Sequence, residues 1–366
     1  MKILFINSIG KHKWGGGEKW MVLAAQELMK RGHHVLIGCR KNSVLEHRAK
    51  SGSLPVVNFS VYTDISLLGG IQIASVFKKE AIDIIVACQN KDVRVAGCIS
   101  KLLKGPLVIS RQGVQLMRNT KKYKWTFKPF CDGIITNTQS IKKEYDSYGW
   151  WSDDYVKVIY NGIPIGQATN TAFDLEAIGI KRHAGTKIIL STGRLAKQKG
   201  FEYLIDAASY VLGHTPDTHF LIAGQGRLEQ ALKQQIESAG LSNRIHMIGF
   251  QNNVPALLQV ADIFVLSSLY EGMPNALMEA LAHGTPAVST RVNGVEELMN
   301  DPDHGCIVPP GDSKALAQGI LKLLEYEDLD AIGLNAQEHM KLNFSVDTMV
   351  NSLEEHLEQL IVKQSK

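Results

Sequence analysis

Two cations in the second half of the chain have the residue types and the spacing that binding of a diphosphate needs. Arg194 and Lys199 follow an apolar run at 187–192, which predicts a buried strand, and they precede a helical pattern at 201–212. A guanidinium and an ammonium group beside a helix N-terminus, which carries about +0.5 of a charge, suit phosphate oxygens. Two solvated loop cations are the alternative interpretation.

The stretch 266–286 carries two carboxylates that suit the hydroxyl groups of a sugar. Pro274 is expected at the first position of a helix, so Glu271 falls in the loop before that helix and Glu279 about one turn inside it. An ionised carboxylate only accepts hydrogen bonds, and sugar hydroxyls can donate them. Two ordinary surface glutamates are the alternative. The amides at the start of this helix can also receive phosphate or sugar oxygens, and they belong to Asn275, Ala276 and Leu277.

Glycines follow several of the predicted strands. Gly193 comes directly after the run 187–192, and a Gly-x-Gly at 224–226 follows a strand predicted at 219–223. A triple glycine at 15–17 follows the first apolar run. Glycine lets the backbone come close to a ligand. For the turn at 224–226, a purely structural strand-to-helix connection is an equally good explanation.

The elements that must position these residues alternate between strands and helices in both halves of the chain. This alternation predicts parallel sheets with helices on both faces. In the first half we predict strands at 2–7, 35–39, 82–88, 107–110 and 133–137 and a helix at 18–31. In the second half we predict strands at 187–192, 219–223, 245–248, 263–266 and 287–289 and helices at 201–212, 227–239, 254–261, 274–283, 313–324 and 346–362.

We therefore expect an α/β protein of two doubly wound, Rossmann-like domains. A length of 366 residues agrees with two domains of about 150 residues or more each. The first domain is predicted at 1–165 and the second at 166–345, with a linker at about 162–185. Ligands of parallel sheets bind outside the carboxyl ends of the strands, so we expect the site in the cleft across which the two domains face each other.

Composition favours a protein of the cytosol. The sequence has no run of about 18 apolar residues, so we expect no transmembrane helix. The apolar stretch at 3–6 is too short for a signal peptide and has the right length for a buried first strand. Five scattered cysteines include no C-x-x-C pair, which argues against a disulfide framework or a zinc site and for a reducing compartment.

A strong asymmetry of charge underlies the net charge of +4. Residues 1–165 carry 25 Lys and Arg against 12 Asp and Glu, whereas residues 166–366 carry 15 against 24. The segment from Arg118 to Lys128 combines five basic and three aromatic residues with no acid, which suits an anionic membrane surface. We expect peripheral contact of the first domain with the inner face of the cytoplasmic membrane. A solvated helix face is the alternative.

Motifs along nearly the whole chain resemble those of the retaining GT-B glycosyltransferases of family GT4. Glu271 and Glu279, with seven residues between them, look like the E-x7-E motif of that family. The resemblance implies two Rossmann-like domains, the first binding the acceptor and the second the donor, and a C-terminal helix at 346–366 that packs back on the first. The other motifs, in the family's order and spacing, are Gly15–Glu18, Asn161–Ile163, Gly193–Arg194 with Lys199–Gly200, Gly224–Gly226, Gly249–Phe250 and Gly311–Asp312.

The resemblance also assigns roles to single residues. Arg194 and Lys199 would hold the donor diphosphate and stabilise the leaving nucleotide, and Glu271 would bond the donor sugar, which makes these three the predicted catalytic residues. Glu279 would bond the ribose hydroxyls. The further predicted donor contacts are Gly16, Gly193, Gly224, Phe250, Gln251, Asn275, Ala276 and Leu277, and the predicted acceptor contacts are Gly17 and Arg111.

One segment departs from the family's pattern. Many relatives have a histidine after the fourth strand of the first domain, near the donor sugar, but the stretch 108–112 reads Val-Ile-Ser-Arg-Gln. Some relatives that act on lipid-linked acceptors have Ser and Arg there. We therefore predict that Arg111 contacts acceptor or donor, and a structural arginine is the alternative.

The predicted function is transfer of a sugar, with retention of configuration, from a nucleotide-sugar to a glycan or lipid-linked acceptor in cell-envelope polysaccharide or lipopolysaccharide biosynthesis. The family favours a UDP-sugar as donor. We expect no cofactor and no metal, because the Asp-x-Asp strings at 301–303 and 328–330 follow no predicted strand.

Four other functions remain as alternatives or are disfavoured. A sugar-nucleotide epimerase of the same fold and a non-catalytic sugar-nucleotide-binding subunit are the alternatives. A Rossmann oxidoreductase needs a G-x-G-x-x-G sequence after its first strand, and the triple glycine at 15–17 does not provide one. Nucleic-acid binding has only the basic first half in its favour, without a recognition motif.

Overall fold

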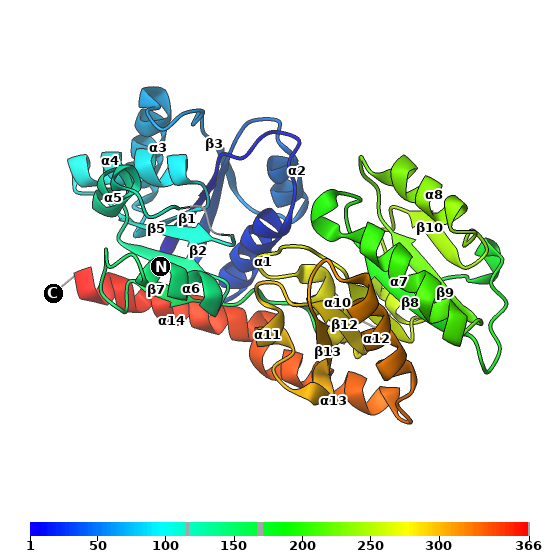
Figure 1. Ribbon diagram of the computed structural model, residues 1–366. Coiled ribbons are helices and arrows are strands. Elements are labelled where there is room, and N and C mark those ends of the chain that lie inside the picture. Colours follow the sequence, from blue (N-terminus) through cyan, green and yellow to red (C-terminus); the bar gives the residue numbers. More distant parts are fainter. Residues whose placement is uncertain (115–116, 167–170, 365–366) are drawn as a thin grey trace. The chain divides into compact units, whose positions relative to one another are not determined.

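The computed structural model describes residues 1–114, 117–166 and 171–364, and the chain divides into two compact units. Unit 1 comprises Met1–Gly162 with Val346–Lys366, and unit 2 comprises Ile163–Ser345. Each unit contains one parallel β-sheet covered by helices (Figure 1). The chain leaves unit 1 after Gly162 and re-enters it at Val346, where the last helix begins.

The sheet of unit 1 has seven parallel strands in the order β3-β2-β1-β4-β5-β6-β7. Its central strands contain uninterrupted runs of buried apolar residues, such as 3–6, 84–87 and 107–109, as a sheet that is covered on both faces requires. The strand order reverses between β1 and β4, which makes this pair the switch point of the sheet. The strands are β1 (Lys2–Asn7), β2 (His34–Cys39), β3 (Val56–Asn58), β4 (Ile84–Ala87), β5 (Leu107–Gln112), β6 (Gly133–Thr136) and β7 (Val156–Val158).

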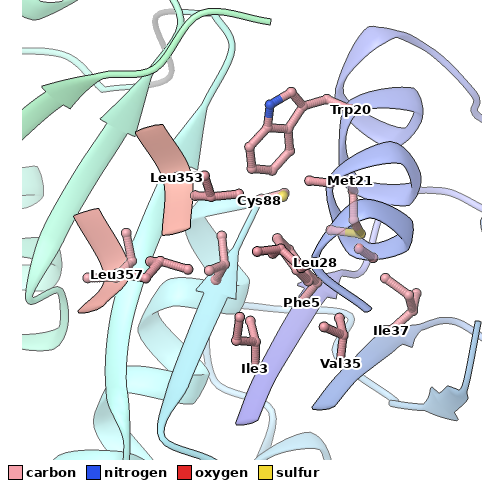
Figure 2. Packing of buried hydrophobic residues seen from close by; sticks show 14 of the residues in the cluster. Ile3, Phe5, Trp20, Met21, Leu28, Val35, Ile37, Cys88, Leu353 and Leu357 are labelled. Carbon is pink, nitrogen blue, oxygen red and sulfur yellow. The ribbon is translucent and has the colours of Figure 1, made fainter. Parts of the chain in front are cut away.

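The last helix of the chain completes the core of unit 1. Leu353 and Leu357 lie fully buried in one apolar cluster with Phe5 and Leu28, and Leu353 lies beside Cys88 (Figure 2). Burying one leucine side chain stabilises a fold by about 1.5–3 kcal/mol, so this helix belongs to the core. The helices of unit 1 are α1 (Gly16–Lys30), α2 (Val44–Ser51), α3 (Leu67–Glu80), α4 (Asn90–Leu103), α5 (Lys121–Phe127), the 3₁₀ helix η1 (Lys128–Phe130), α6 (Gln139–Asp146) and α14 (Val346–Gln364).

Unit 2 repeats the same plan with six parallel strands in the order β10-β9-β8-β11-β12-β13. Its switch point lies between β8 and β11. The strands are β8 (Lys187–Thr192), β9 (Thr218–Ala223), β10 (Ile245–Gly249), β11 (Ile263–Leu266), β12 (Ala287–Thr290) and β13 (Gly305–Val308). The helices are η2 (Glu176–Ile178), η3 (Lys197–Lys199), α7 (Phe201–His214), α8 (Glu229–Ser238), α9 (Val254–Leu258), α10 (Asn275–His283), α11 (Val295–Leu298), η4 (Pro302–His304), α12 (Ser313–Leu324) and α13 (Leu329–Phe344).

The predicted α/β fold with two doubly wound parallel sheets is confirmed. The prediction missed the strands β3, β7 and β13, which have three or four residues and lie at sheet edges. Such short edge strands carry too few apolar residues to show a pattern. Residues 167–170 of the predicted linker and 365–366 of the predicted last helix lie outside the described residues.

Among the described residues, no helix is both long enough and apolar enough to cross a bilayer.

Candidate functional site

The predicted cations and carboxylates of unit 2 come from the two strands that flank its switch point. Strand β8 is followed by the loop with Arg194 and by η3, which carries Lys199. Strand β11, which pairs with β8, is followed by the loop with Glu271 and then by α10. Right-handed crossovers send the chain to opposite faces of the sheet after β8 and after β11. The loops that carry these residues therefore start side by side.

An ion pair joins the two loops. The Nζ atom of Lys199 lies 2.6 Å from Oε1 of Glu271, although 71 residues separate them in sequence. The Lys199 side chain is 19% exposed and the Glu271 side chain 10%, so the pair is mostly shielded from water and keeps a small exposed surface. A carboxylate has about four lone-pair positions, and further donors occupy some of those of Glu271. Ser268 Oγ donates to Oε1 at 2.7 Å, and Gln198 Nε2 to Oε2 at 3.3 Å.

Backbone contacts hold the two loops in place around this pair. Ser267 Oγ donates to the carbonyl of Lys199 at 2.9 Å, and the Leu269 amide donates to the carbonyl of Gln198 at 2.8 Å. A Cβ atom on Gly200 would overlap the Ser267 carbonyl, and the φ of Gly200 is +58°, so only glycine fits there. The geometry of the ion pair is therefore preorganised by the loops that carry it.

Glu271 was predicted from the sequence, but the residues that orient it were not. Gln198 and Ser268 hold the carboxylate, and Thr290 at the end of β12 donates to the Ser268 carbonyl at 2.6 Å. Ser267 and Ser268 follow directly after the predicted strand 263–266, which is the position where a hydroxyl can be aimed into a switch point. This position could have indicated a role for the two serines in the site. The sequence around Gln198 and Thr290 contains no such indication.

The remaining predicted residues after β8 and β9 differ in their surroundings. Arg194 is exposed, as a residue that meets a soluble anion needs to be. Gly193 donates its amide to the Ala223 carbonyl at 2.9 Å, which ties the loops after β8 and β9 together. A Cβ atom on Gly224 would overlap the carbonyl of Gly193. This contact supports the structural explanation of Gly224, and its contact with a donor stays a prediction.

Helix α10 begins one residue later than predicted. Pro274 is the N-cap, with φ −78° and ψ +96°, and the helix starts at Asn275. The reason is that the extended ψ of Pro274 places it outside the helix, where its missing N–H costs nothing. The amides of Asn275, Ala276 and Leu277 are then the first in the helix, and such amides have no partner within it. Glu279 lies one turn further along, half-buried.

Phe250 and Gln251 follow strand β10 at the edge of the same sheet. Phe250 is 60% exposed, and Gln251 Nε2 donates to the carbonyl of Ile248 at 2.7 Å. An exposed aromatic ring beside a fixed amide group can stack on a planar ligand. The neighbouring strand β9 links this edge to Gly224, whose amide donates to the Gly249 carbonyl at 2.8 Å.

In unit 1, the predicted residues gather at the start of α1 and at the end of β5. Gly16 is the first residue of α1, and a Cβ atom on Gly17 would lie 3.7 Å from Nη1 of Arg111. Arg111 is 5% exposed, its Nη2 donates to Asn161 Oδ1 at 2.8 Å, and its guanidinium carbon lies 4.5 Å from the ring centroid of Trp20. Burial lowers the pKa of this guanidinium. These partners support the structural explanation of Arg111, and its contact with a substrate stays a prediction.

A buried pair of polar side chains fills the switch point of unit 1. Asp92, in the first turn of α4, accepts hydrogen bonds from the Ser8 amide at 2.9 Å and from Ser8 Oγ. Asp92 has no exposed surface, and this burial raises the pKa of its carboxyl to about 6. Nearby, Asn7 Nδ2 donates to Glu18 Oε1 at 2.8 Å, and both residues are buried. No role for Ser8 or Asp92 was predicted from the sequence.

The two Asp-x-Asp strings serve helix ends. Asp301 Oδ1 accepts from the Asp303 amide at 2.9 Å at the start of η4, and Asp328 Oδ1 accepts from the Ala331 amide at 2.9 Å at the start of α13. Within the described ranges, one group could bind a metal ion, and it consists of His33, Glu354 and Glu358 in unit 1. Arg31 Nη1 already lies 2.7 Å from Glu354, which lowers the attraction of this group for a cation.

Models of two protein families match most of the chain. The model described as Glycosyltransferase Family 4 matches residues 14–167, and the model described as Glycosyl transferases group 1 matches residues 176–339. The first match lies within unit 1 apart from its last five residues, and the second lies within unit 2.

Curated relatives and a solved structure agree with these matches. The chain is 26% identical, over 84% of its length and 82% of the relative, to the UDP-Gal:alpha-D-GlcNAc-diphosphoundecaprenol alpha-1,3-galactosyltransferase of Escherichia coli. It is 29% identical, over 60% of each chain, to the lipopolysaccharide core biosynthesis glycosyltransferase LpsE of Rhizobium meliloti. The structure of Alr3699/HepE from Anabaena, in complex with UDP, superposes with a TM-score of 0.82 at 24% identity and covers 98% of this chain and 100% of that chain.

The similarity to HepE by itself shows the fold. The family matches add the family, and the group 1 model matches the part of the chain that contains the loop with Arg194, the pair of Lys199 and Glu271, and helix α10. The resemblance expected from the sequence is thereby confirmed: the chain belongs to the group 1 glycosyltransferases of family GT4, with the GT-B fold.

Proposed function

We propose that this glycosyltransferase moves a sugar from a UDP-sugar to a glycan or lipid-linked acceptor during the synthesis of a cell-envelope polysaccharide or lipopolysaccharide. The observation that carries the proposal is the ion pair of Lys199 and Glu271 at the switch point of unit 2. It sets a cation for a diphosphate beside a carboxylate for a sugar. The loop with Arg194 and the first amides of α10 start from the same two strands.

The chemistry follows from where charge develops during transfer. When the bond between the anomeric carbon and the diphosphate breaks, negative charge grows on the leaving oxygen. Arg194, Lys199 and the positive N-terminus of α10 then stabilise that charge more strongly than they stabilise the ground state, which is the requirement for catalysis. Glu271 accepts hydrogen bonds from the donor sugar and orients it.

The proposal includes retention of configuration and independence of metal ions. Retention means that the acceptor enters from the face that the diphosphate leaves. The cations named above would carry the charge that a divalent metal carries in other transferases. Activity in the presence of EDTA tests the second point, and the anomeric configuration of the product tests the first.

The nucleoside of the donor is assigned to α10 and to the edge of β10. Glu279 accepts the two ribose hydroxyl groups, and the exposed ring of Phe250 and the amide of Gln251 lie beside the base. Uridine is proposed because the names of two relatives point to it. The Escherichia coli enzyme uses UDP-Gal, and the Anabaena protein was solved with UDP.

The acceptor is assigned to unit 1, where Gly16 and Gly17 begin α1 and Arg111 lies beside Gly17. A lipid-linked acceptor agrees with the name of the Escherichia coli relative, whose acceptor is a diphosphoundecaprenol derivative. It also agrees with the excess of basic residues in the first 165 residues. We therefore place the enzyme in the cytoplasm, in peripheral contact with the inner face of the membrane through the segment Arg118–Lys128.

A thermal-shift panel of UDP, GDP, ADP and TDP, measured with EDTA, tests the donor site. A ligand at 100 times its Kd adds about 2.7 kcal/mol to the free energy of unfolding. We expect UDP to raise the Tm of the wild-type protein, and we expect Arg194→Ala and Glu279→Ala to lose the shift. Lys197→Ala is the matched control, because Lys197 is an exposed cation in the same loop. No shift with any diphosphate would contradict the proposal, whereas a shift without transfer of sugar would favour a non-catalytic sugar-nucleotide-binding subunit.

A further inference from the structure

Unit 1 exposes a strip of large hydrophobic side chains that its core does not use. Tyr62, Ile65, Leu67, Leu68 and Ile71 are 60%, 89%, 80%, 59% and 60% exposed. They occupy the loop before α3 and the first turns of that helix. Single exposed hydrophobic residues are common on protein surfaces, whereas a contiguous group marks an interaction site. We call these five residues the apolar strip.

The apolar strip is held in a defined conformation. Ser66 caps α3, since its Oγ accepts from the Gly69 amide at 3.4 Å and donates to the Ser60 carbonyl at 2.8 Å. The guanidinium carbon of Arg40 lies 4.7 Å from the ring centroid of Tyr62. Because these contacts fix the loop, the strip can meet a partner without the entropic cost of first being ordered.

The basic segment of unit 1 lies beside the apolar strip. Arg94 on α4 joins the two, because its Nη1 lies 2.8 Å from Asp64 Oδ1 and its guanidinium carbon lies 5.4 Å from the ring centroid of Tyr123 on α5. Helix α5 exposes Trp125, at 76%, and three lysines. Those lysines are Lys121, Lys122 and Lys124.

The charges around the apolar strip and α5 indicate which kind of partner fits this surface. Asp64 is the one acidic residue between Tyr62 and Ile71, and Arg94 pairs with it. The face therefore presents lysines and aromatic rings next to aliphatic side chains. Lysines attract anionic headgroups, tryptophan and tyrosine prefer the interface, and leucine and isoleucine prefer the acyl region. A protein partner would need an acidic surface with an apolar centre, whereas an anionic bilayer supplies both properties by its nature.

We propose that the apolar strip inserts into an anionic bilayer while the lysines of α5 bind its headgroups. This inference rests on the membrane contact proposed above and adds the residues that enter the bilayer, which the sequence analysis did not identify. The aliphatic side chains give the contact its depth, and the lysines give it selectivity for anionic lipid.

Flotation of the full-length protein with lipid vesicles tests the proposal. We expect binding to phosphatidylcholine vesicles that contain phosphatidylglycerol and weak binding to pure phosphatidylcholine. Leu67→Gln with Leu68→Gln should weaken binding by about tenfold or more, since each leucine loses its favourable transfer from water. Replacing the lysines of α5, in Lys121→Gln with Lys122→Gln and Lys124→Gln, should weaken it by about 100-fold at low salt.

A matched control comes from α13 in unit 2. Leu334 and Leu342 are 63% and 64% exposed, so Leu334→Gln with Leu342→Gln removes two leucines of similar exposure elsewhere. This variant should bind vesicles like the wild type. Because all four leucines are exposed, the variants should keep the wild-type Tm, which a melting curve checks.

Three outcomes would overturn the inference. Equal binding by the Leu67/Leu68 variant and the wild type would limit the contact to α5. Absence of binding to phosphatidylglycerol vesicles would remove the membrane contact altogether. A dimer in sedimentation that the Leu67/Leu68 variant abolishes, without vesicle binding, would assign the strip to a second copy of the chain. Hydrolysis of a UDP-sugar without lipid, measured alongside, reports on the proposed transferase activity separately.

Discussion

The two units of this glycosyltransferase share one topology and use its switch point in different ways. In unit 2 the switch point carries charged side chains that keep some contact with water: Arg194 is exposed, and Lys199 and Glu271 keep a small exposed surface. In unit 1 the corresponding position is filled by buried side chains, among them Asp92 and Ser8.

The difference shows that a doubly wound sheet supplies a place for a ligand and does not by itself supply the ligand's partners. A charge that is to meet a substrate must keep part of its hydration until the substrate replaces it, because burying a charge without a partner is costly. The buried charge of Arg111 in unit 1 has its partners within the unit, namely Asn161 and Trp20. Substitutions at the two switch points should therefore change activity in one unit and stability in the other.

The largest effect is expected for Lys199→Ala. Loss of one group that stabilises the developing charge on a leaving group lowers kcat by about 10²–10³-fold. The Tm should change little, since Glu271 keeps its hydrogen bonds from Ser268 and Gln198. Steady-state kinetics with the UDP-sugar, compared with Lys197→Ala, measure this. If Lys199→Ala lowered stability and left kcat unchanged, the switch point of unit 2 would serve stability and not activity.

Arg111→Ala should act mainly on stability. Removal of one member of a buried charged network costs about 3–5 kcal/mol, because Asn161 and nearby Glu18 lose a partner or a compensating charge. Chemical denaturation measures the free energy of unfolding, and Arg194→Ala is the comparison, which should leave it unchanged. Unchanged kcat/KM in Arg111→Ala under native conditions would end the prediction that Arg111 contacts a substrate.

Asp92 should make the stability of unit 1 depend on pH in an unusual direction. Its carboxyl has a pKa of about 6 in the folded chain and about 3.9 when unfolded. Between these values the folded state binds more protons, so the free energy of unfolding falls as pH rises from about 4 to 6, by about 3 kcal/mol for this group.

Denaturation curves from pH 4 to 7 for the wild type and Asp92→Asn isolate this contribution. The difference in the free energy of unfolding between the two proteins should change between about pH 4 and 6 and level off towards pH 7. Paired carboxylates such as Glu354, whose pKa is lowered by Arg31, act in the opposite direction in both proteins and cancel in the difference. A constant difference from pH 4 to 7 would mean that Asp92 is ionised throughout.

The smallest effect concerns the Asp-x-Asp string at the start of α13. Asp328→Ala should lower the free energy of unfolding by about 1 kcal/mol, the usual loss for a helix N-cap. Asp330→Ala should lower it by only a few tenths of a kcal/mol through the helix dipole. Neither should change activity with or without EDTA. A selective loss of activity in either variant would place a second carboxylate site in unit 2.

An element could be predicted from the sequence when its apolar residues form a clear local pattern. Strands β8 and β11 and helix α12 have the predicted bounds, because their apolar runs are continuous or periodic and end at clear signals. Helix α13 was missed, and its apolar positions are diluted by polar ones such as Asn335 and Gln337.

The candidate site divides in the same way. Placement of Arg194, Lys199 and Glu271 after strands followed from local patterns, whereas the ion pair depends on the pairing of β8 with β11, which no local pattern contains. The glycine at 224 had two explanations in the sequence, and only the position of the Gly193 carbonyl separates them. The neutral tendency of Asp92 is likewise a result of burial that a sequence cannot display.

The return of the chain to unit 1 at Val346 has a consequence for how the protein can be taken apart. Unit 2 is an insertion into unit 1, and its two ends adjoin each other: the Ile163 amide donates to the Phe344 carbonyl at 2.9 Å, and Ile163 pairs with Ser345 in a parallel bridge. Adjacent termini are what circular permutation and domain excision require. Residues 163–345 should therefore fold as an autonomous fragment, whereas a cut after residue 345 should unfold unit 1, because that unit would lose Leu353 and Leu357 from its core.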